Sequence, residues 1–210
     1  MSVRRVAGGG VAIVLMLLPG LIAAGYPRSS ASFPGTGDVV PLRPPLTRRP
    51  VADAYVRGGT AAEVNFGTAA QLLAKLGVSD DNSQISYMKF DLRDVALVGR
   101  ATLRLSSRLS NTATSSVETI VRAVANTSWD ERTVTWRNRP AIGAALGSIT
   151  VRGTTAQWHE VDVTSYVQAE KRAGRNVITL ALQNATQSSA QVQAASRETG
   201  AEAPALVIVP

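Results

Sequence analysis

Residues 87–92 read YMKFDL, and this stretch decides the fold class. Apolar side chains occupy every second position from Met88 to Leu92, and side chains with polar ends occupy the positions between them. A period of two is typical of a β-strand that buries one face and exposes the other. The runs ATLRLS (101–106) and NVITLALQ (176–183) repeat the pattern. The sequence therefore predicts an antiparallel sheet.

Short segments of the same kind recur from residue 51 onward, and we expect nine or ten strands. The further segments lie at 51–57, 117–124, 132–136, 147–151, 157–163, 190–196 and 205–209. Turn-forming clusters such as RGGT (57–60) and SDDN (79–82) separate the segments at a spacing typical of two packed sheets. We predict an all-β fold, an antiparallel β-sandwich of the jelly-roll type.

One short helix is expected between two of these strands. Asp162 or Thr164 is a suitable residue to cap its start, and Gly174 can end it. We expect this helix to close one end of the sandwich.

The first 50 residues follow a different pattern. Residues 1–25 combine Arg4 and Arg5 with a short apolar run at 11–18 and end in small residues, which is the pattern of a secretory signal peptide. We expect cleavage after Gly25 or, alternatively, after Ala31. The apolar run is shorter than the roughly 20 residues that span a bilayer. Contact with a membrane is therefore expected only if the segment stays uncleaved.

Residues 26–50 are rich in Pro, Gly, Ser and Arg and show no apolar period. This composition is typical of an extended linker. It leaves residues 51–210 as one domain, which we expect to be secreted or held at the cell surface.

Composition limits the partners and the means of stabilisation. The chain has no cysteine, so disulfides and a lipid anchor on cysteine are both excluded. The net charge is +7, but residues 1–50 carry six Arg against one Asp. Residues 51–210 carry 16 Lys and Arg against 14 Asp and Glu, which is ordinary for a folded domain. Nucleic-acid binding needs a concentrated basic face, so we expect no nucleic-acid partner.

Few catalytic templates fit the sequence. His159 is the only histidine, and G-x-S-x-G, P-loop and G-x-G-x-x-G segments are absent. His159 shares a predicted strand face with Val161, so we expect it to point inward. Three pairs of acids could supply the two carboxylates of a glycosidase: Asp80 with Asp81, Asp130 with Glu131, and Glu160 with Asp162. Turns, helix caps and calcium sites are commoner roles for such acids, so we expect a non-catalytic protein.

A surface of aromatic and cationic side chains is the positive signal for function. Tyr55 and Arg57 share one face of the strand at 51–57, and Tyr87 and Lys89 share one face of the strand at 85–91. If the two strands lie together, these side chains line one open sheet. Tyrosine rings can stack on sugar rings, and Lys or Arg can pair with the carboxylates of an acidic sugar. The alternative is a solvated sheet face with ordinary cross-strand pairs.

Other large side chains are given less specific roles. Arg197 is either a ligand contact or a partner of Glu198 or Asp53. The tryptophans are expected to pack inside the domain: Trp129, Trp136 and Trp158.

Several ordered blocks of sequence together resemble one family. They are DAYVRGGTAAEVNFG (53–67), YMKFDL (87–92), ATLRL (101–105), SWDERTVTWRNRP (128–140), DVTSYV (162–167), SRETG (196–200) and PALVIV (204–209). The set resembles the DNRLRE domain, a disaggregatase-related repeat grouped with carbohydrate-binding module family 96. The resemblance extends over essentially all of residues 51–210.

The resemblance implies a non-catalytic jelly roll that binds a polysaccharide, with acidic, uronate-type polymers bound by some members. The family's ligand surface matches Arg57, Lys75 and Lys89. Calcium of structural type is the candidate cofactor, with Asp53 and Asp162 as its candidate ligands. Taken with the predicted open sheet, the full set of candidate sugar-binding residues is Tyr55, Arg57, Lys75, Tyr87, Lys89 and Arg197.

Two other functions stay open at this point. One is a structural or adhesive module of the cell envelope that binds no sugar. The other is a polysaccharide lyase that uses His159 or Tyr87.

Overall fold

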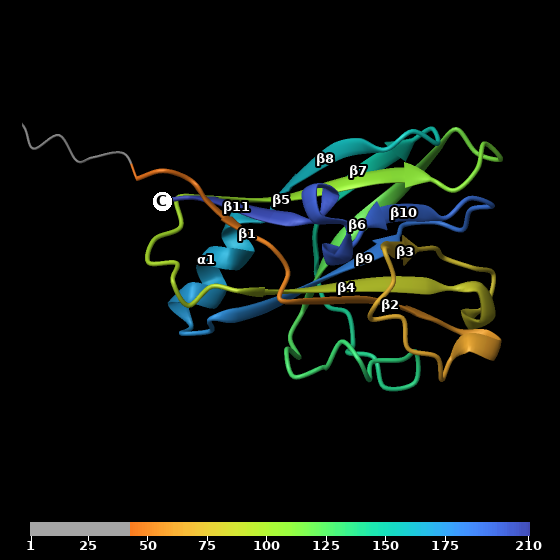
Figure 1. The fold of residues 1–210 in the computed structure, drawn as a ribbon, viewed down its shortest axis with the longest axis horizontal. Coiled ribbons are helices and arrows are strands. Elements are labelled where there is room, and N and C mark those ends of the chain that lie inside the picture. The colour runs from red at the N-terminus through yellow and green to blue at the C-terminus, as the bar shows by residue number, and fades with distance from the viewer. Residues whose placement is uncertain (1–42) are drawn as a thin grey trace, which may run out of the picture. The chain divides into compact units, whose positions relative to one another are not determined.

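Two antiparallel sheets pack face to face in the computed structural model, which describes residues 43–210 (Figure 1). The strands are β1 (Leu46–Arg48), β2 (Ala52–Arg57), β3 (Gln71–Ala74), β4 (Gln84–Asp91), β5 (Arg100–Leu109), β6 (Ser116–Val124), β7 (Ala145–Arg152), β8 (Gln157–Asp162), β9 (Val177–Asn184), β10 (Val192–Ala195) and β11 (Ala205–Val209). The α-helix is α1 (Thr164–Arg172), and the 3₁₀ helices are η1 (Gly59–Ala61), η2 (Asp80–Asn82) and η3 (Arg197–Glu202). The predicted all-β sandwich is confirmed.

The chain crosses repeatedly between the two sheets. The first sheet has the order β1-β11-β5-β10-β3, and β8 also pairs with β5. The second sheet has the order β2-β4-β9-β6-β7. Among the described strands, β6 and β7 are the one pair that is consecutive in the chain and joined in a ladder. Most ladder contacts are therefore long-range, as expected for a sandwich.

The main core lies between the sheets and is built from alternate residues of each strand. Met88 and Phe90 of β4 are buried against Leu103 of β5 and Leu180 of β9, as the period of two predicts. Helix α1 lies at one end of the sandwich and adds the buried Val167 to this core (Figure 1). The expected position of the helix is therefore confirmed.

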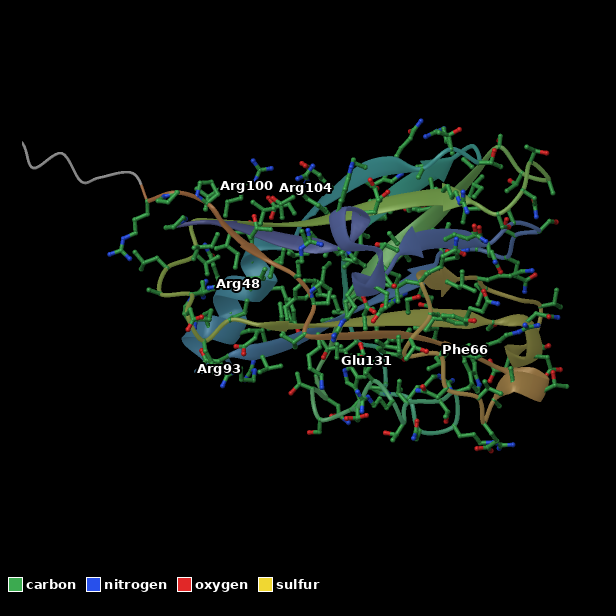
Figure 2. All side chains as sticks on the ribbon, in the orientation of Figure 1. Arg48, Phe66, Arg93, Arg100, Arg104 and Glu131 are labelled. Carbon is green, nitrogen blue, oxygen red and sulfur yellow. The ribbon has the colours of Figure 1, made fainter. Side chains whose placement is uncertain are left out.

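A second, smaller core lies on the outer face of the second sheet. Residues 125–144 form a long irregular segment, here called the covering loop, which passes beneath β2 and β4 in Figure 1. Its Trp129, Val134 and Trp136 pack against Val56 of β2 and Tyr87 of β4. Figure 2 shows Glu131 on this side of the molecule and Arg104 on the opposite side. One face of the predicted open sheet is therefore covered.

The structure corrects some strand predictions. Residues 132–136 belong to the covering loop and form turns, although Val134 and Trp136 are buried as their alternation suggests. Strand β3 was absent from the expected set. Strand β1 lies within the predicted linker and pairs with β11, so the sandwich begins before residue 51.

The helix forms where it was predicted, and its end at Gly174 is confirmed by the positive φ of 74° at that residue. The predicted N-cap was wrong: the N-cap is Val163, which makes no side-chain capping bond, and Asp162 precedes it with Oδ1 accepting a hydrogen bond from the backbone N–H of Thr164. Within residues 43–210 no helix is long and apolar enough to cross a membrane. The predicted signal peptide (1–25) and most of the predicted linker lie outside the described residues.

Candidate functional site

The covering loop is anchored to the segment that follows η1. The side-chain amide of Asn65 donates hydrogen bonds of 2.8 Å to the carbonyl oxygens of Glu131 and Val134. Gly67 lies so close that a Cβ atom there would be 1.9 Å from the carbonyl oxygen of Glu131. Only glycine allows this approach, and the contact fixes the backbone of Glu131 beside β2.

The register of β2 and β4 separates the predicted ligand residues. Ala54 is the direct partner of Tyr87, and Tyr55 is the direct partner of Ser86. Direct partners in an antiparallel pair lie on the same face, so Tyr55 and Arg57 lie on the opposite face from Tyr87 and Lys89. The prediction of one shared open face was wrong, because it assumed a register that the sequence does not specify.

Tyr87 and Lys89 are both held by the covering loop. Tyr87 is 0% exposed, its hydroxyl donates to the carbonyl oxygen of Pro140 at 2.8 Å, and burial raises its pKa. The Lys89 ammonium lies 4.7 Å from the ring centroid of Trp129 and donates to the carbonyl oxygen of that residue. Burial lowers the pKa of Lys89. Both side chains therefore have structural partners.

Tyr55 and Arg57 have different surroundings although they share a face. The ring of Tyr55 stacks on Phe66 with centroids 4.3 Å apart and an interplanar angle of 15°. Arg57 is exposed and lines a hollow between η1 and η2. Of the two, Arg57 is the one that reaches a concave surface.

Two adjoining hollows at this end of the sandwich form what we call the end groove. Their volumes are about 460 Å³ and 670 Å³, and both are lined by Asp80 and Trp136. Lys75 lines the first hollow, with Tyr87 at its wall, and Arg57 lines the second. The structure thus brings together Arg57 and Lys75 but leaves Lys89 and Arg197 outside the groove.

Arg139 is a groove residue that the sequence analysis missed. Its guanidinium carbon lies 3.7 Å from the ring centroid of Trp136, and it donates a hydrogen bond to the carbonyl oxygen of that residue. These contacts hold the cation in place on the buried indole. The available signal was the run TWRNRP (135–140), where two arginines and a proline follow an apolar aromatic residue.

The shape of the end groove depends on a close contact between η1 and η2. A Cβ atom on Gly58 would lie 1.9 Å from the carbonyl oxygen of Asp80 and 3.2 Å from the ring of Trp136. Because Gly58 has no side chain, the start of η1 can approach η2 and Trp136 closely.

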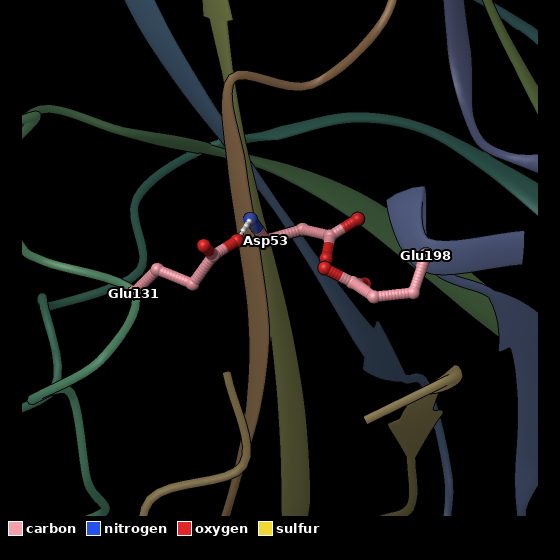
Figure 3. Close-up of side chains that lie close together, drawn as sticks. All are labelled: Asp53, Glu131 and Glu198. Carbon is pink, nitrogen blue, oxygen red and sulfur yellow. Dashed lines mark hydrogen bonds between the residues drawn. The ribbon is translucent and has the colours of Figure 1, made fainter. Parts of the chain in front are cut away.

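Three carboxylates meet elsewhere, at the edge strand β2. Asp53, Glu131 and Glu198 each offer an oxygen within 4.8 Å of the others, and we call them the acidic cluster. Figure 3 shows Glu131 and Glu198 on opposite sides of Asp53, with the Glu131 carboxylate on the backbone N–H of Asp53. That hydrogen bond is 2.7 Å long. Oxygen ligands of this kind suit calcium.

Asp53 is the buried member of the acidic cluster. It is 1% exposed, its Oδ2 accepts from the backbone N–H of Arg197 at 2.8 Å, and its Oδ1 has no hydrogen-bond partner among the described residues. Burial raises the pKa of Asp53 to about 7, although the hydrogen bond from the backbone N–H of Arg197 lowers it. An unpartnered buried oxygen beside two further carboxylates is consistent with a cation ligand or with a bound proton.

The other predicted residues near these acids have distinct positions. The Arg197 guanidinium lies 3.4 Å from Glu131 and 3.6 Å from Glu198, so the interpretation of Arg197 as a carboxylate partner is supported. Asp162 is exposed, lies 3.9 Å from Arg100 and accepts a hydrogen bond from the backbone N–H of Thr164, the first residue of α1. Asp162 is not part of the acidic cluster, and its contacts are those of a residue that leads into a helix.

The residues considered for catalysis are dispersed. His159 pairs with Leu105 on the inner face of the first sheet, whereas Tyr87 lies on the outer face of the second sheet. Burial lowers the pKa of His159. Within the acid pairs, Asp130 Oδ1 accepts from the N–H of Arg132 while Glu131 joins the acidic cluster. Asp80 lines the first hollow with Tyr87 and the second hollow with Asp81. The other candidates line neither hollow: His159, Asp130, Glu131, Glu160 and Asp162.

Comparison with known proteins identifies the family of this chain. The profile of carbohydrate-binding module family 96 matches residues 44–210, which is most of the chain. The chain belongs to this family. The family 96 module is also similar to a gellan lyase from Bacillus sp., with 28% identity over 205 residues. The match covers 94% of this chain and 8% of that protein, so the chain spans a small part of the relative's length.

One solved structure has a distant likeness to the module. It is the K1 cleaved adhesin domain of Lys-gingipain from Porphyromonas gingivalis W83, with 11% identity and a TM-score of 0.37. The match covers 80% of this chain and 99% of that domain.

Proposed function

We propose that this carbohydrate-binding module holds an acidic polysaccharide in the end groove. The observation that carries the proposal is the charge of the groove walls. Four cations line the two hollows, Arg57, Lys75, Arg137 and Arg139, against two carboxylates, Asp80 and Asp81. Arg137 is partly neutralised by Glu63 at 2.7 Å, which leaves the other three cations to face the ligand.

Arg139, Arg57 and Lys75 can contact different parts of the polymer. Arg139 is fixed on Trp136, so it loses little conformational freedom when it pairs with a uronate carboxylate. Lys75 lines the first hollow and Arg57 the second, so the two cations can contact neighbouring sugars along the polymer. Because the pairs are solvent-accessible, binding should weaken as salt is increased.

The test is affinity electrophoresis of the full chain in gels that contain gellan, alginate or a neutral glucan, at low and high NaCl. Gellan belongs in the panel because one relative is a gellan lyase. The double variant Arg57→Ala/Lys75→Ala should lose retardation by acidic polymers. The matched variant Arg93→Ala/Arg172→Ala removes two exposed cations outside the end groove. Acidic polymers should still retard this variant.

Each alternative function has its own outcome. Equal retardation of the two double variants would remove the end groove as the site. Binding to no polymer would favour the structural or adhesive module. Release of unsaturated sugars from a uronate polymer, lost in Tyr87→Phe, would favour the lyase.

We also propose that the acidic cluster holds a structural calcium ion. Asp53, Glu131 and Glu198 would supply its protein oxygens, and the ion would offset the charge of the buried carboxylate. Asp162 is left out of this proposal because it lies away from the cluster.

An extracellular location is the third part of the proposal. It is supported by the signal-like pattern of residues 1–25. The N-terminal sequence of the protein recovered from culture medium would test it, with cleavage after Gly25 or Ala31 expected.

A further inference from the structure

The outer face of the first sheet carries a second concave surface, away from the end groove. On this face Trp158 of β8 is the direct partner of Ser106, and Gln193 of β10 is the direct partner of Arg108. Strand β5 therefore joins the two outer rows of side chains. Helix η3 borders the same surface with Thr199 and Glu202.

These elements enclose a hollow of about 330 Å³, here called the sheet hollow. It shares no lining residue with the two hollows of the end groove. The volume is at the lower end of the range of known ligand sites and suits one or two units of a polymer. Its lining residues are Ala70, Gln71, Ser106, Arg108, Ala156, Trp158, Gln193, Ala194, Ala195, Thr199 and Glu202.

Trp158 is the exceptional side chain of the sheet hollow. It is 43% exposed, whereas Trp129 and Trp136 are buried, so the expectation that it packs in the core was wrong. Arg104 supports it, with the guanidinium carbon 4.9 Å from the ring centroid, and Arg104 is held in turn by Glu160 at 3.0 Å. Figure 2 shows Arg104 on this outer side of the molecule. The indole is thus positioned by neighbours while it stays open to a ligand.

The polar groups of the sheet hollow are joined by a hydrogen bond, and their net charge is close to zero. Arg108 Nε donates to Gln193 Oε1 at 3.2 Å, which leaves the amide N–H₂ of Gln193 as a donor. Arg108 and Glu202 balance each other in charge, in contrast to the cationic end groove. A wall that combines one aromatic ring with amide and hydroxyl groups matches a sugar ring, which has apolar C–H faces and a hydroxyl edge.

We propose that the sheet hollow is a second binding subsite, specific for a neutral sugar residue that stacks on Trp158. Gln193, Gln71 and Thr199 would hydrogen-bond its hydroxyl groups. The inference rests on the proposed carbohydrate-binding function, but it does not depend on the acidic ligand or on the cations of the end groove.

The test is a calorimetric titration of the full chain and its variants with neutral gluco-oligosaccharides, with tryptophan fluorescence and acrylamide quenching recorded in addition on the native protein. Trp158 is the exposed tryptophan, so a bound sugar should change the emission and reduce quenching. Trp158→Ala should weaken binding roughly tenfold or more, and Trp158→Phe should weaken it less. Leu97→Ala is the matched control, because Leu97 is 60% exposed and lies outside the sheet hollow.

The variants separate this inference from the proposed function. Arg57→Ala/Lys75→Ala should leave neutral-sugar binding unchanged. Binding of acidic polymers alone, with no fluorescence response to neutral sugars, would overturn the second subsite and leave the end groove intact. Loss of self-association in Trp158→Ala, measured by sedimentation, would instead assign the surface to a second copy of the chain. Absence of any carbohydrate binding would overturn both proposals.

Discussion

The hydroxyl group of Tyr87 donates a hydrogen bond of 2.8 Å to the carbonyl oxygen of Pro140, which lies 53 residues later in the chain. Both residues also line the first hollow of the end groove. The bond therefore ties the covering loop to β4 beside the proposed site. It gives Tyr87 a structural role that differs from the sugar-stacking role predicted from the strand pattern.

Tyr87→Phe should lower the free energy of unfolding by about 1 to 2 kcal/mol, because the buried carbonyl oxygen of Pro140 loses its partner. Chemical denaturation measures the change. Tyr55→Phe is the control, since Tyr55 is only half-buried, and it should cost less. Equal stability of the two variants would contradict the role assigned to the hydrogen bond.

The stability of the calcium-free protein should fall as pH rises from about 4 to about 7. The pKa of Asp53 is raised to about 7 from its ordinary value of 3.8, so in this range the folded chain holds a proton that the unfolded chain has released. The contribution is complete below the unfolded value and is lost as pH passes the folded value. Denaturation in chelator at several pH values should show this slope in the native protein and a flatter one in Asp53→Asn. Parallel slopes would show that Asp53 does not titrate in this way.

Calcium should raise the melting temperature most at pH 8, where Asp53 is ionised and can act as a ligand. An ion present at 100 times its dissociation constant would add roughly 2.7 kcal/mol. Glu131→Gln/Glu198→Gln should abolish the shift. Asp162→Asn, which alters an acid outside the acidic cluster, should preserve it. If chelator leaves the native melting temperature unchanged at pH 8, the proposed ion is absent.

The tryptophans should differ sharply in their effect on stability. Trp129→Ala should cost about 3 to 5 kcal/mol, because it empties part of the second core and removes the 3.1 Å hydrogen bond to Thr179. Trp158→Ala should cost under about 1 kcal/mol, since its ring is exposed. Denaturation of the two variants side by side measures the difference. A large loss of stability in Trp158→Ala would show that Trp158 serves packing.

The sequence correctly predicted which side chains are buried where the residues of a single strand alternate between apolar and polar. The alternation of apolar and polar residues correctly placed Met88 and Phe90 in the core, and Gly174 correctly marked the end of the helix. The N-cap is Val163, a residue whose side chain carries no capping signal. Strand β1 was missed because it has three residues and lies in a Pro- and Arg-rich segment, where it is stabilised by pairing with β11. Such pairing is a long-range contact that local composition does not record.

Period and composition by themselves determined the fold class, the buried face of each long strand and the absence of disulfides, because these follow from side-chain spacing and residue type. Only the tertiary structure decided which strands are neighbours and in what register. That register put Tyr55 and Tyr87 on opposite faces and left Arg57 and Lys75 with Arg139 in the end groove. It also brought Asp53 to Glu198 and exposed Trp158. A shift of one residue reverses the face of every side chain on a strand, so a surface assembled from several strands cannot be read from any one of them.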